Sequence, residues 1–264
     1  MKIPIYQADT FTDKLFGGNP AAICLLDDWL SDELLQQIAS ENNLSETAFL
    51  VKDKDEGQYH IRWFTPGTEV DLCGHATLAS AHILFNLPGH TSDTLRFHSK
   101  SGLLIVKKLE AGKLMLDFPA NAPEELKEIP ANLFEGLGLA PVPVYKTSFD
   151  YMVVVPSEKI IIGLMPDFKT LARVPCRGVI VTAKGDSADF VSRCFYPQSG
   201  IDEDPVTGSA HTIMVPYWAA QLNKTQMQAI QLSKRRGYLD CELAGDRVLM
   251  SGNAVEYMRG EIEV

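Results

Sequence analysis

The first half of the chain carries both helix-like and strand-like apolar patterns. Ser31 is a candidate N-cap for a helix that places Leu34, Leu35 and Ile38 at helical spacing and ends near residues 42 and 43. A second helix is expected over about 74–84, where small residues would let surrounding strands approach closely. The remaining apolar runs of this half predict strands at 1–10, 21–27, 47–51, 59–64, 94–98, 102–108 and 113–118.

The second half of the chain shows the same mixture of helix-like and strand-like apolar patterns. A short helix is expected near 131–137, and a longer one from Gly208 to about residue 222, where Pro216 should cause a kink because it has no backbone N–H. Strands are predicted near 150–155, 177–183, 190–196, 228–234, 237–243 and 246–250. Since strands dominate each half and each half has one long apolar helix, the sequence predicts an α+β protein with a central helix in each lobe.

The segment 119–125 is rich in proline and small residues, so we place a domain boundary there. The expected domains are 1–119 and 120–251. The pattern does not decide where residues 252–264 lie; one option is that they return to the first domain as an additional strand.

Two segments of the chain resemble each other. The first contains Phe64-Thr65-Pro66 and continues through 69–77; the second contains Phe195-Tyr196-Pro197 and continues through 202–211. Each runs from Phe-x-Pro through acidic residues to a glycine that opens a helix. The unpaired N–H groups at such a helix start lie at the positive end of the helix dipole and can bind an anion. The repeat therefore predicts two related halves that bind one acidic small molecule.

Composition narrows the class of protein. The chain has 264 residues, of which 45% are apolar, so it can bury a full core. Its formal charge of -10 argues against nucleic acid as a partner. Five scattered cysteines indicate reduced thiols rather than disulfides or a zinc site. The chain shows no signal-peptide run and no apolar stretch of membrane-spanning length, so we expect a soluble cytoplasmic protein that does not bind membranes.

Glu46 is the first candidate for chemistry. It precedes the apolar strand 47–51, so its carboxylate could lie at the edge of a core, where desolvation would raise its pKa toward neutrality and suit it to proton transfer. The alternative is a solvated carboxylate in a turn, and this residue alone favours that alternative.

His75 follows Gly74 within the first turn of its helix, where the helix dipole should favour the neutral imidazole. Its alternative role is simply to cap the turn. His75 and His82 share one helix face, but no acidic or thiol partner stands at ligand spacing, so no metal site is predicted. Cys73 could be a thiolate, because a helix N-terminus lowers the pKa of a thiol.

In the second segment, Pro205 holds Asp204 extended, so that Asp204 could orient a histidine or a substrate hydroxyl, or merely form a turn. Ser209 follows Gly208 and could bind an anion through its hydroxyl and N–H, or act as an N-cap. No P-loop and no G-x-G-x-x-G motif is present, so ATP and NAD are not expected.

Four motifs in this order resemble the hallmarks of the phenazine-biosynthesis PhzF-like family, distant relatives of diaminopimelate epimerase, and the resemblance covers nearly the whole chain. They are Phe16-Gly17-Gly18-Asn19-Pro20-Ala21-Ala22, Ser45-Glu46-Thr47-Ala48-Phe49, Asp71-Leu72-Cys73-Gly74-His75-Ala76-Thr77 and Glu203-Asp204-Pro205-Val206-Thr207-Gly208-Ser209-Ala210-His211.

The resemblance implies a diaminopimelate epimerase-like fold, with two pseudo-symmetric lobes that each wrap a β-barrel-like sheet around a central helix and share a cleft. It also implies a homodimeric, cofactor-free and metal-free isomerase that acts on a small anionic metabolite. By similarity, Glu46 would take and return the proton, and His75 and Asp204 would assist. The implied substrate-binding residues are Asn19, Asp71, Cys73, Gly74, Gly208 and Ser209.

The chain departs from the epimerase pattern in one respect. Epimerases of that lineage use two facing cysteines, whereas here Thr207 stands where the second would be. Threonine is not a useful base near neutral pH, so a proton shift by a single base on one face of the substrate is expected. Two alternatives stay open: a proton-abstracting, epimerase-like enzyme that uses Glu46 or Cys73 differently, and a metabolite-binding protein without turnover.

Overall fold

The computed structural model describes residues 1–264, which form two compact units. The first unit comprises Met1–Phe118 and Leu249–Val264, and the second comprises Pro119–Val248. That each one folds as an independent domain stays a prediction.

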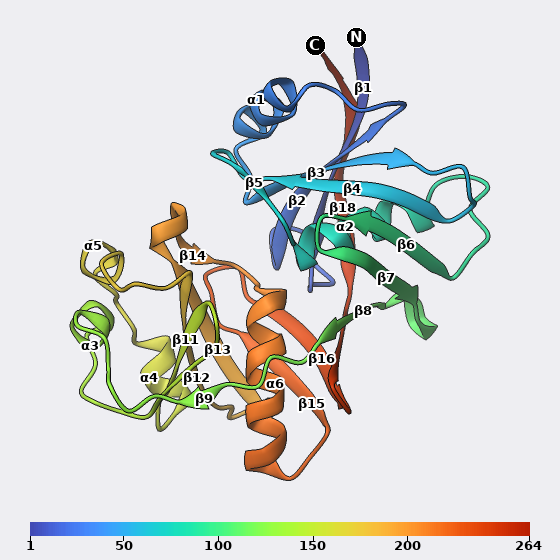
Figure 1. Cartoon of the computed structure of the whole chain (residues 1–264). Coiled ribbons are helices and arrows are strands. Elements are labelled where there is room, and N and C mark those ends of the chain that lie inside the picture. Colours follow the sequence, from blue (N-terminus) through green and yellow to red (C-terminus); the bar gives the residue numbers. More distant parts are fainter. The chain divides into compact units, whose positions relative to one another are not determined.

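The first unit is a curved sheet around one buried helix (Figure 1). Along the sheet, β18 pairs with β1, then β1 with β2, β2 with β3, β3 with β4, β4 with β6, β6 with β7 and β7 with β8. Its elements are β1 (Lys2–Thr10), β2 (Asn19–Leu26), α1 (Asp32–Asn42), β3 (Glu46–Lys52), β4 (Gln58–Phe64), β5 (Glu69–Val70), α2 (Gly74–Phe85), β6 (Thr94–Ser99), β7 (Gly102–Lys108), the 3-10 turn η1 (Glu110–Gly112), β8 (Leu114–Pro119) and β18 (Ala254–Glu263).

The two helices of this unit are buried to different extents because their apolar residues are distributed differently. Ser31 caps α1 as predicted, since its Oγ accepts a hydrogen bond from the N–H of Leu34 at 3.3 Å. α1 buries only one face, which carries Leu35 and Ile38. α2 is buried along its whole length except at His82, as expected for a helix that is apolar all round. It packs against β1, β2, β3, β7 and β18 and is the central helix of the unit.

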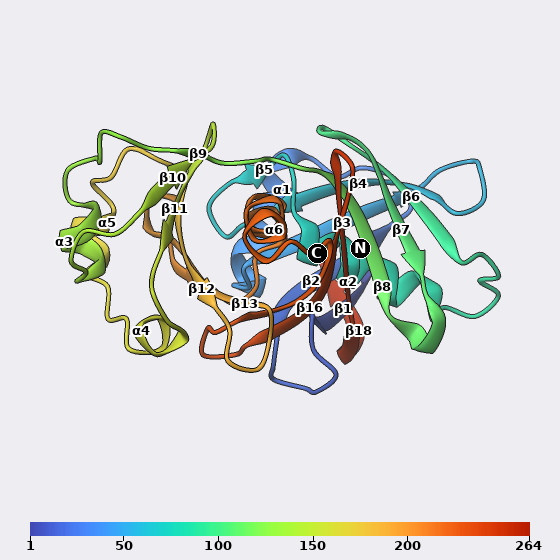
Figure 2. The same cartoon turned by 90° about the horizontal axis from the view of Figure 1, so that it is seen from below.

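The second unit repeats this plan around α6. Figure 2 shows α6 nearly end-on, with β12 and β13 curving past it. Its elements are β9 (Glu124–Glu125), α3 (Leu133–Leu137), β10 (Val144–Lys146), β11 (Asp150–Val154), α4 (Glu158–Ile162), α5 (Phe168–Leu171), β12 (Gly178–Lys184), β13 (Phe190–Tyr196), the 3-10 turn η2 (Pro197–Ser199), β14 (Ile201–Asp204), α6 (Gly208–Leu222), β15 (Gln226–Gln231) and β16 (Gly237–Ala244). The strand β17 (Arg247–Gly252) begins in the second unit and ends in the first.

The strand pairings show that the two units are repeats of one another. From β1 to β7, successive pairings are antiparallel, parallel, antiparallel, parallel and antiparallel. From β10 to β16 the same senses follow in the same order. In each unit a short strand, β5 or β14, pairs with the end of the preceding strand and leads into the central helix. The α+β prediction with one central helix per half is confirmed.

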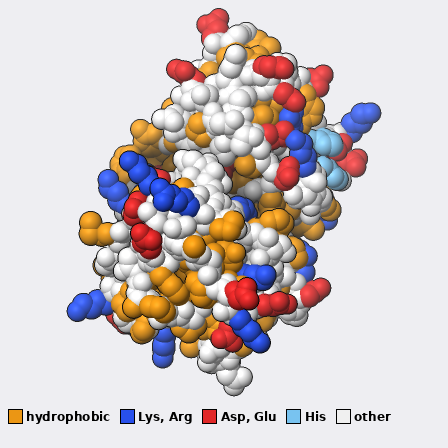
Figure 3. All heavy atoms as spheres, turned by 60° about the vertical axis from the view of Figure 1, so that its left-hand side comes forward, with side chains coloured by type: hydrophobic (Ala, Val, Ile, Leu, Met, Phe, Trp, Pro, Cys, Tyr) orange, Lys and Arg blue, Asp and Glu red, His pale blue; other side chains and the backbone are white.

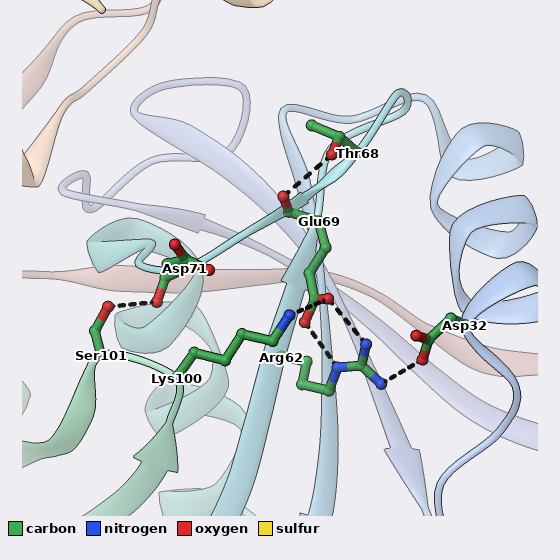
Figure 4. A network of polar contacts seen from close by, with 7 residues as sticks. All are labelled: Asp32, Arg62, Thr68, Glu69, Asp71, Lys100 and Ser101. Atoms are coloured by element: carbon green, nitrogen blue, oxygen red, sulfur yellow. Dashed lines mark hydrogen bonds and ion pairs between the residues drawn. The ribbon is translucent and has the colours of Figure 1, made fainter.

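An arginine–glutamate pair fixes this short strand in both units. Arg62 on β4 donates from Nε and Nη2 to the carboxylate of Glu69 on β5, at 2.7 and 2.9 Å. Arg193 on β13 makes the same two bonds to Glu203 on β14, at 2.7 and 2.8 Å. Figure 4 shows that Asp32 and Lys100 extend the pair of the first unit. We call each pair the Arg–Glu clamp of its unit.

The structure corrects several sequence predictions. The short strands β5, β10 and β14 and the short helices α4 and α5 were not predicted, because two to five residues are too few to show a period. α6 runs as one helix from Gly208 to Leu222 with Pro216 inside it, as expected, and the kink at Pro216 stays a prediction. Strand β15 begins at Gln226, earlier than expected, and ends at Gln231.

Two general properties of the molecule bear on its partners. No helix combines the length and the apolar character needed to cross a membrane. The face drawn in Figure 3 carries basic and acidic side chains in mixed small groups rather than a continuous basic surface.

Candidate active site

In the first unit, the start of α2 meets the starts of two neighbouring strands. Glu46 is the first residue of β3, which lies beside β2 with Glu46 opposite Ala21. His75 is the second residue of α2. Its Nε2 lies 3.1 Å from Oε2 of Glu46. The sequence separates these residues by 29 positions, and the sheet brings them together.

The other side of the His75 ring faces two further predicted residues. Sγ of Cys73, the N-cap residue of α2, lies 3.5 Å from Nδ1. Nδ2 of Asn19, at the start of β2, lies 3.2 Å from the same nitrogen. Asn19, Glu46, Cys73 and His75 therefore form one cluster beside Gly74.

This cluster is largely out of solvent. The side chain of His75 is 5% exposed and that of Glu46 is 13% exposed. Glu46 is therefore not the solvated turn residue that its local sequence favoured. Glu46 Oε2 and His75 Nε2 face each other within ion-pair distance, yet neither has an aligned hydrogen-bond partner. Such orphaned buried polar atoms are rare, and they mark a place where a ligand could complete the bonding.

The expectation that His75 is neutral is wrong. Burial works to lower the pKa of His75, but its neighbours Cys73 and Glu46 raise that pKa well above the usual value of histidine. The Glu46 carboxylate, 3.1 Å from Nε2, contributes to this rise, because a nearby opposite charge favours the charged form.

The expectation of a Cys73 thiolate is also wrong. Burial, together with the charge of Glu46, raises the pKa of the Cys73 thiol to about 11. Cys73 is therefore a neutral thiol near pH 7.

The reason given above for excluding a metal does not hold. One ligand atom each from Glu46, Cys73 and His75 lies within 4.8 Å of the other two, so acidic and thiol partners do stand beside His75. His82, which the sequence suggested as its partner, does not belong to this group.

Asp71 lies apart from the cluster. It is exposed in the loop between β5 and α2, and the contact recorded for it runs from Oγ of Ser101 to its backbone carbonyl at 2.8 Å (Figure 4). No contact joins its carboxylate to Glu46 or His75. A role for Asp71 in binding stays a prediction.

In the second unit, Asp204 is the last residue of β14 and accepts a hydrogen bond from the hydroxyl of Thr207 at 2.6 Å. The nearest candidate histidine, His211, instead donates from Nδ1 to the carbonyl of Thr207 at 2.8 Å. Within this unit Asp204 therefore positions a threonine rather than a histidine. Ser209 is not an N-cap, because Thr207 occupies that position of α6.

Sequence reasoning missed Arg177. Its Nη2 donates to Oγ of Ser209 at 3.1 Å, so a guanidinium lies at the start of α6. Arg177 is held by two hydrogen bonds to the carboxylate of Asp150, one of them from Nε at 2.9 Å. No local motif could have revealed this, because Arg177 and Ser209 are 32 residues apart and meet only in the folded unit.

Both central helices begin without a side-chain cap. Neither Cys73 on α2 nor Thr207 on α6 accepts a hydrogen bond from the first turn of its helix. Ser31 on α1 and Asp167 on α5 do provide such caps. A helix start without a capping side chain is typical of helix N-termini that bind an anion, so the starts of α2 and α6 are both candidate anion sites.

A large cavity of the first unit lies elsewhere. It measures about 790 Å³ and is lined by Trp29, Tyr59, His90 and their neighbours, and by none of the predicted site residues. Size alone therefore does not identify the site.

Comparison with known proteins supports the fold and the class. The family model "Phenazine biosynthesis-like protein" (PhzC-PhzF) matches residues 8–260. A Pseudomonas aeruginosa protein named as an uncharacterized isomerase is 53% identical over 264 residues, covering all of both chains. The crystal structure of a PhzF family protein from Enterococcus faecalis superimposes with a TM-score of 0.94 at 45% identity, again over all of both chains.

A more distant structure bears on the fold alone. A predicted epimerase from Pseudomonas aeruginosa superimposes with a TM-score of 0.76 at 17% identity and covers 99% of each chain. The expected epimerase-like fold and the isomerase class are confirmed by these likenesses. They name neither a substrate nor a catalytic residue.

Proposed function

Because the chain belongs to the phenazine biosynthesis-like (PhzC-PhzF) family, we propose that it is a cofactor-independent isomerase that shifts a proton within a small carboxylate-bearing metabolite. Glu46 is the proposed acid and base. The observation that carries this proposal is the largely buried Glu46 carboxylate, 3.1 Å from His75 at the uncapped start of α2.

The proposed reaction has two proton transfers. In the first, Glu46 removes a proton from a carbon next to a conjugated system: the C–H bond breaks, an O–H bond forms on Glu46, and the electron pair enters the conjugated system. In the second, the protonated Glu46 returns that proton to a different carbon. One carboxylic acid on one face is sufficient, so Thr207 in place of a second thiol is no obstacle.

The surroundings of Glu46 are suited to this chemistry. The negative charge that develops on the substrate needs fixed donors in a site without bulk water. The imidazolium of His75 and the first-turn amides of α2, beginning at Gly74, are such donors. The side-chain amide of Asn19 lies beside Nδ1 of His75 and, with its oxygen turned toward that nitrogen, would accept a hydrogen bond from the imidazolium and hold the ring in place.

For the second unit, we propose that Gly208, Ser209 and Arg177 bind an anionic group of the substrate and that Asp204 orients it. Support comes from the uncapped start of α6 and from the guanidinium beside the Ser209 hydroxyl. That this group and the Glu46 cluster act on one substrate molecule is a prediction from the family resemblance.

Solvent exchange tests the proposal. The protein is incubated in D2O with a panel of small cyclic unsaturated amino and hydroxy acids, and deuterium incorporation is followed by NMR. We expect Glu46→Gln to slow exchange by about 10²- to 10⁴-fold, the usual contribution of a general base. Cys73→Ser should retain exchange.

Other outcomes decide between the alternatives. Exchange that survives in Glu46→Gln contradicts the proposed base. Loss of exchange in Cys73→Ser instead indicates an epimerase-like use of the thiol. Saturable binding without any exchange indicates a metabolite-binding protein that does not turn over.

A further inference from the structure

The cluster at the start of α2 combines a thiol, an imidazole and a carboxylate, and we propose that Glu46, Cys73 and His75 bind a zinc-like divalent cation that reversibly blocks the site. Only the effect on turnover rests on the function proposed above. Binding of the ion follows from the side chains alone.

The ligand set suits zinc. Zn²⁺ binds thiolate sulfur, imidazole nitrogen and carboxylate oxygen, and sites with three protein ligands leave a fourth position open. In tetrahedral coordination such ligand atoms lie roughly 3.3 to 3.6 Å apart, as follows from bond lengths of about 2.0 to 2.3 Å. Here Sγ of Cys73 lies 3.5 Å from Nδ1 of His75, and Oε2 of Glu46 lies 3.1 Å from Nε2 of the same ring, so each distance is close to a coordination edge but the two involve different nitrogens.

A second observation also points to a ligand. Oε2 of Glu46 and Nε2 of His75 are buried without an aligned hydrogen-bond partner, and the His75 side chain is only 5% exposed. The two atoms are ion-pair partners at 3.1 Å without hydrogen-bond alignment, so a bound cation can offset the desolvation cost that this pair leaves uncompensated. They belong to two of the three candidate ligands.

Binding requires a small rearrangement. Cys73 faces Nδ1 of His75 and Glu46 faces Nε2, and an ion takes only one of these nitrogens. The three ligand atoms lie within 4.8 Å of one another, so at least one side chain must move by about 1 Å to reach bonding distance. Cys73 must lose its thiol proton to solvent as the sulfur–metal bond forms, and His75 binds through a nitrogen without a proton.

The bound ion would stop proton transfer. It takes the lone pairs with which Glu46 removes a proton, and it takes the lone pair of one His75 nitrogen, so that His75 no longer acts as a positively charged hydrogen-bond donor. Since the ion is held by side chains alone, removing it with a chelator restores the site.

Co²⁺ is the probe for binding, because its bond to a thiolate produces an absorption band in the near ultraviolet. We expect one Co²⁺ or Zn²⁺ per chain, measured by absorption and by calorimetry on the full-length protein. Cys73→Ser should abolish the band and weaken binding at least about 100-fold, more than the loss of an outer hydrogen-bond partner does. Glu46→Gln should weaken binding without abolishing the band. Cys176→Ser, a matched control in the second unit, should change neither.

The outcomes separate this proposal from the isomerase function. An unchanged band in Cys73→Ser, or no stoichiometric binding to the wild type, overturns the metal site whatever the enzyme does. Exchange of deuterium that stays undiminished under saturating Zn²⁺ overturns the block. If Cys73→Ser fails to fold by circular dichroism, His75→Gln takes its place, with the same expected loss of affinity.

Discussion

His75 and His211 stand near the starts of the two central helices, and their environments move their pKa values in opposite directions. His75 has a carboxylate 3.1 Å away and its pKa is raised. His211 has no anion beside it, and burial lowers its pKa to about 4. Its Nδ1 donates to the carbonyl of Thr207, while its buried Nε2 has no partner. The charge of a buried histidine therefore depends on the groups around it and cannot be predicted from the residue type alone.

The low pKa of His211 predicts that the free energy of unfolding decreases at acidic pH. In the unfolded chain a histidine titrates near pH 6.5, whereas folded His211 titrates at about 4. Between these pH values the unfolded state binds the additional proton, so the free energy of unfolding falls as the pH falls. The free energy of unfolding falls by about 3 kcal/mol in total over this range. Above pH 6.5, His211 does not change the pH dependence of that free energy. Urea unfolding at several pH values measures it.

His211→Gln should remove this part of the pH dependence, and His60→Gln, which changes a half-exposed histidine, should leave it in place. A variant at position 211 whose free energy of unfolding still falls by the wild-type amount between pH 7 and pH 4 contradicts the argument.

At the scale of elements, the Arg–Glu clamp of the second unit is expected to contribute more to the free energy of unfolding than an exposed ion pair does. Arg193 and Glu203 are 13% and 20% exposed, and Arg193 also donates to the carbonyls of Ile161 and Leu164. Arg193→Met removes the donor of the Leu164 carbonyl and of the Glu203 carboxylate and should destabilise the protein by about 2 kcal/mol, between the values for exposed and buried ion pairs. Arg259→Met, which breaks an exposed pair with Glu256, should cost less than about 1 kcal/mol. Thermal unfolding of both variants gives the comparison, and equal losses would refute this account of the clamp.

At the scale of the whole molecule, the C-terminal strand predicts the effect of truncation. β18 pairs with β1 from Lys2 opposite Glu263 to Thr10 opposite Ala254, and Ile262 packs against the core around Ile3 and Ile5. Deleting 254–264 uncovers this strand edge and should unfold the first unit. Limited proteolysis should then digest the first unit and spare the second. A truncated protein that resists protease over its full length would disprove this role of β18.

The homodimer that the family resemblance implies is also a prediction about the whole molecule. One chain has a mass of 29.2 kDa, so a dimer has 2 × 29.2 = 58.4 kDa. Light scattering on the purified protein distinguishes the two masses, and a single species near the mass of one chain rules the dimer out.

The amino-acid sequence by itself determined the repeat, the central helices that begin at Gly74 and Gly208, the Ser31 cap and the family. These features depend on short-range patterns of apolar, small and capping residues, which act within a few turns or strands. Local patterns also identified Glu46, Cys73 and His75 of the cluster as candidates, and the family resemblance added Asn19.

Only the tertiary structure decided how these residues interact. It set Glu46 against His75, which reversed the expected charge of the ring, and it buried Cys73, which kept the thiol protonated. It also brought Arg177 to Ser209. The physical reason is common to all three: pKa values and ion pairs depend on distances of a few ångströms and on burial, and residues far apart in sequence acquire both only when the chain folds.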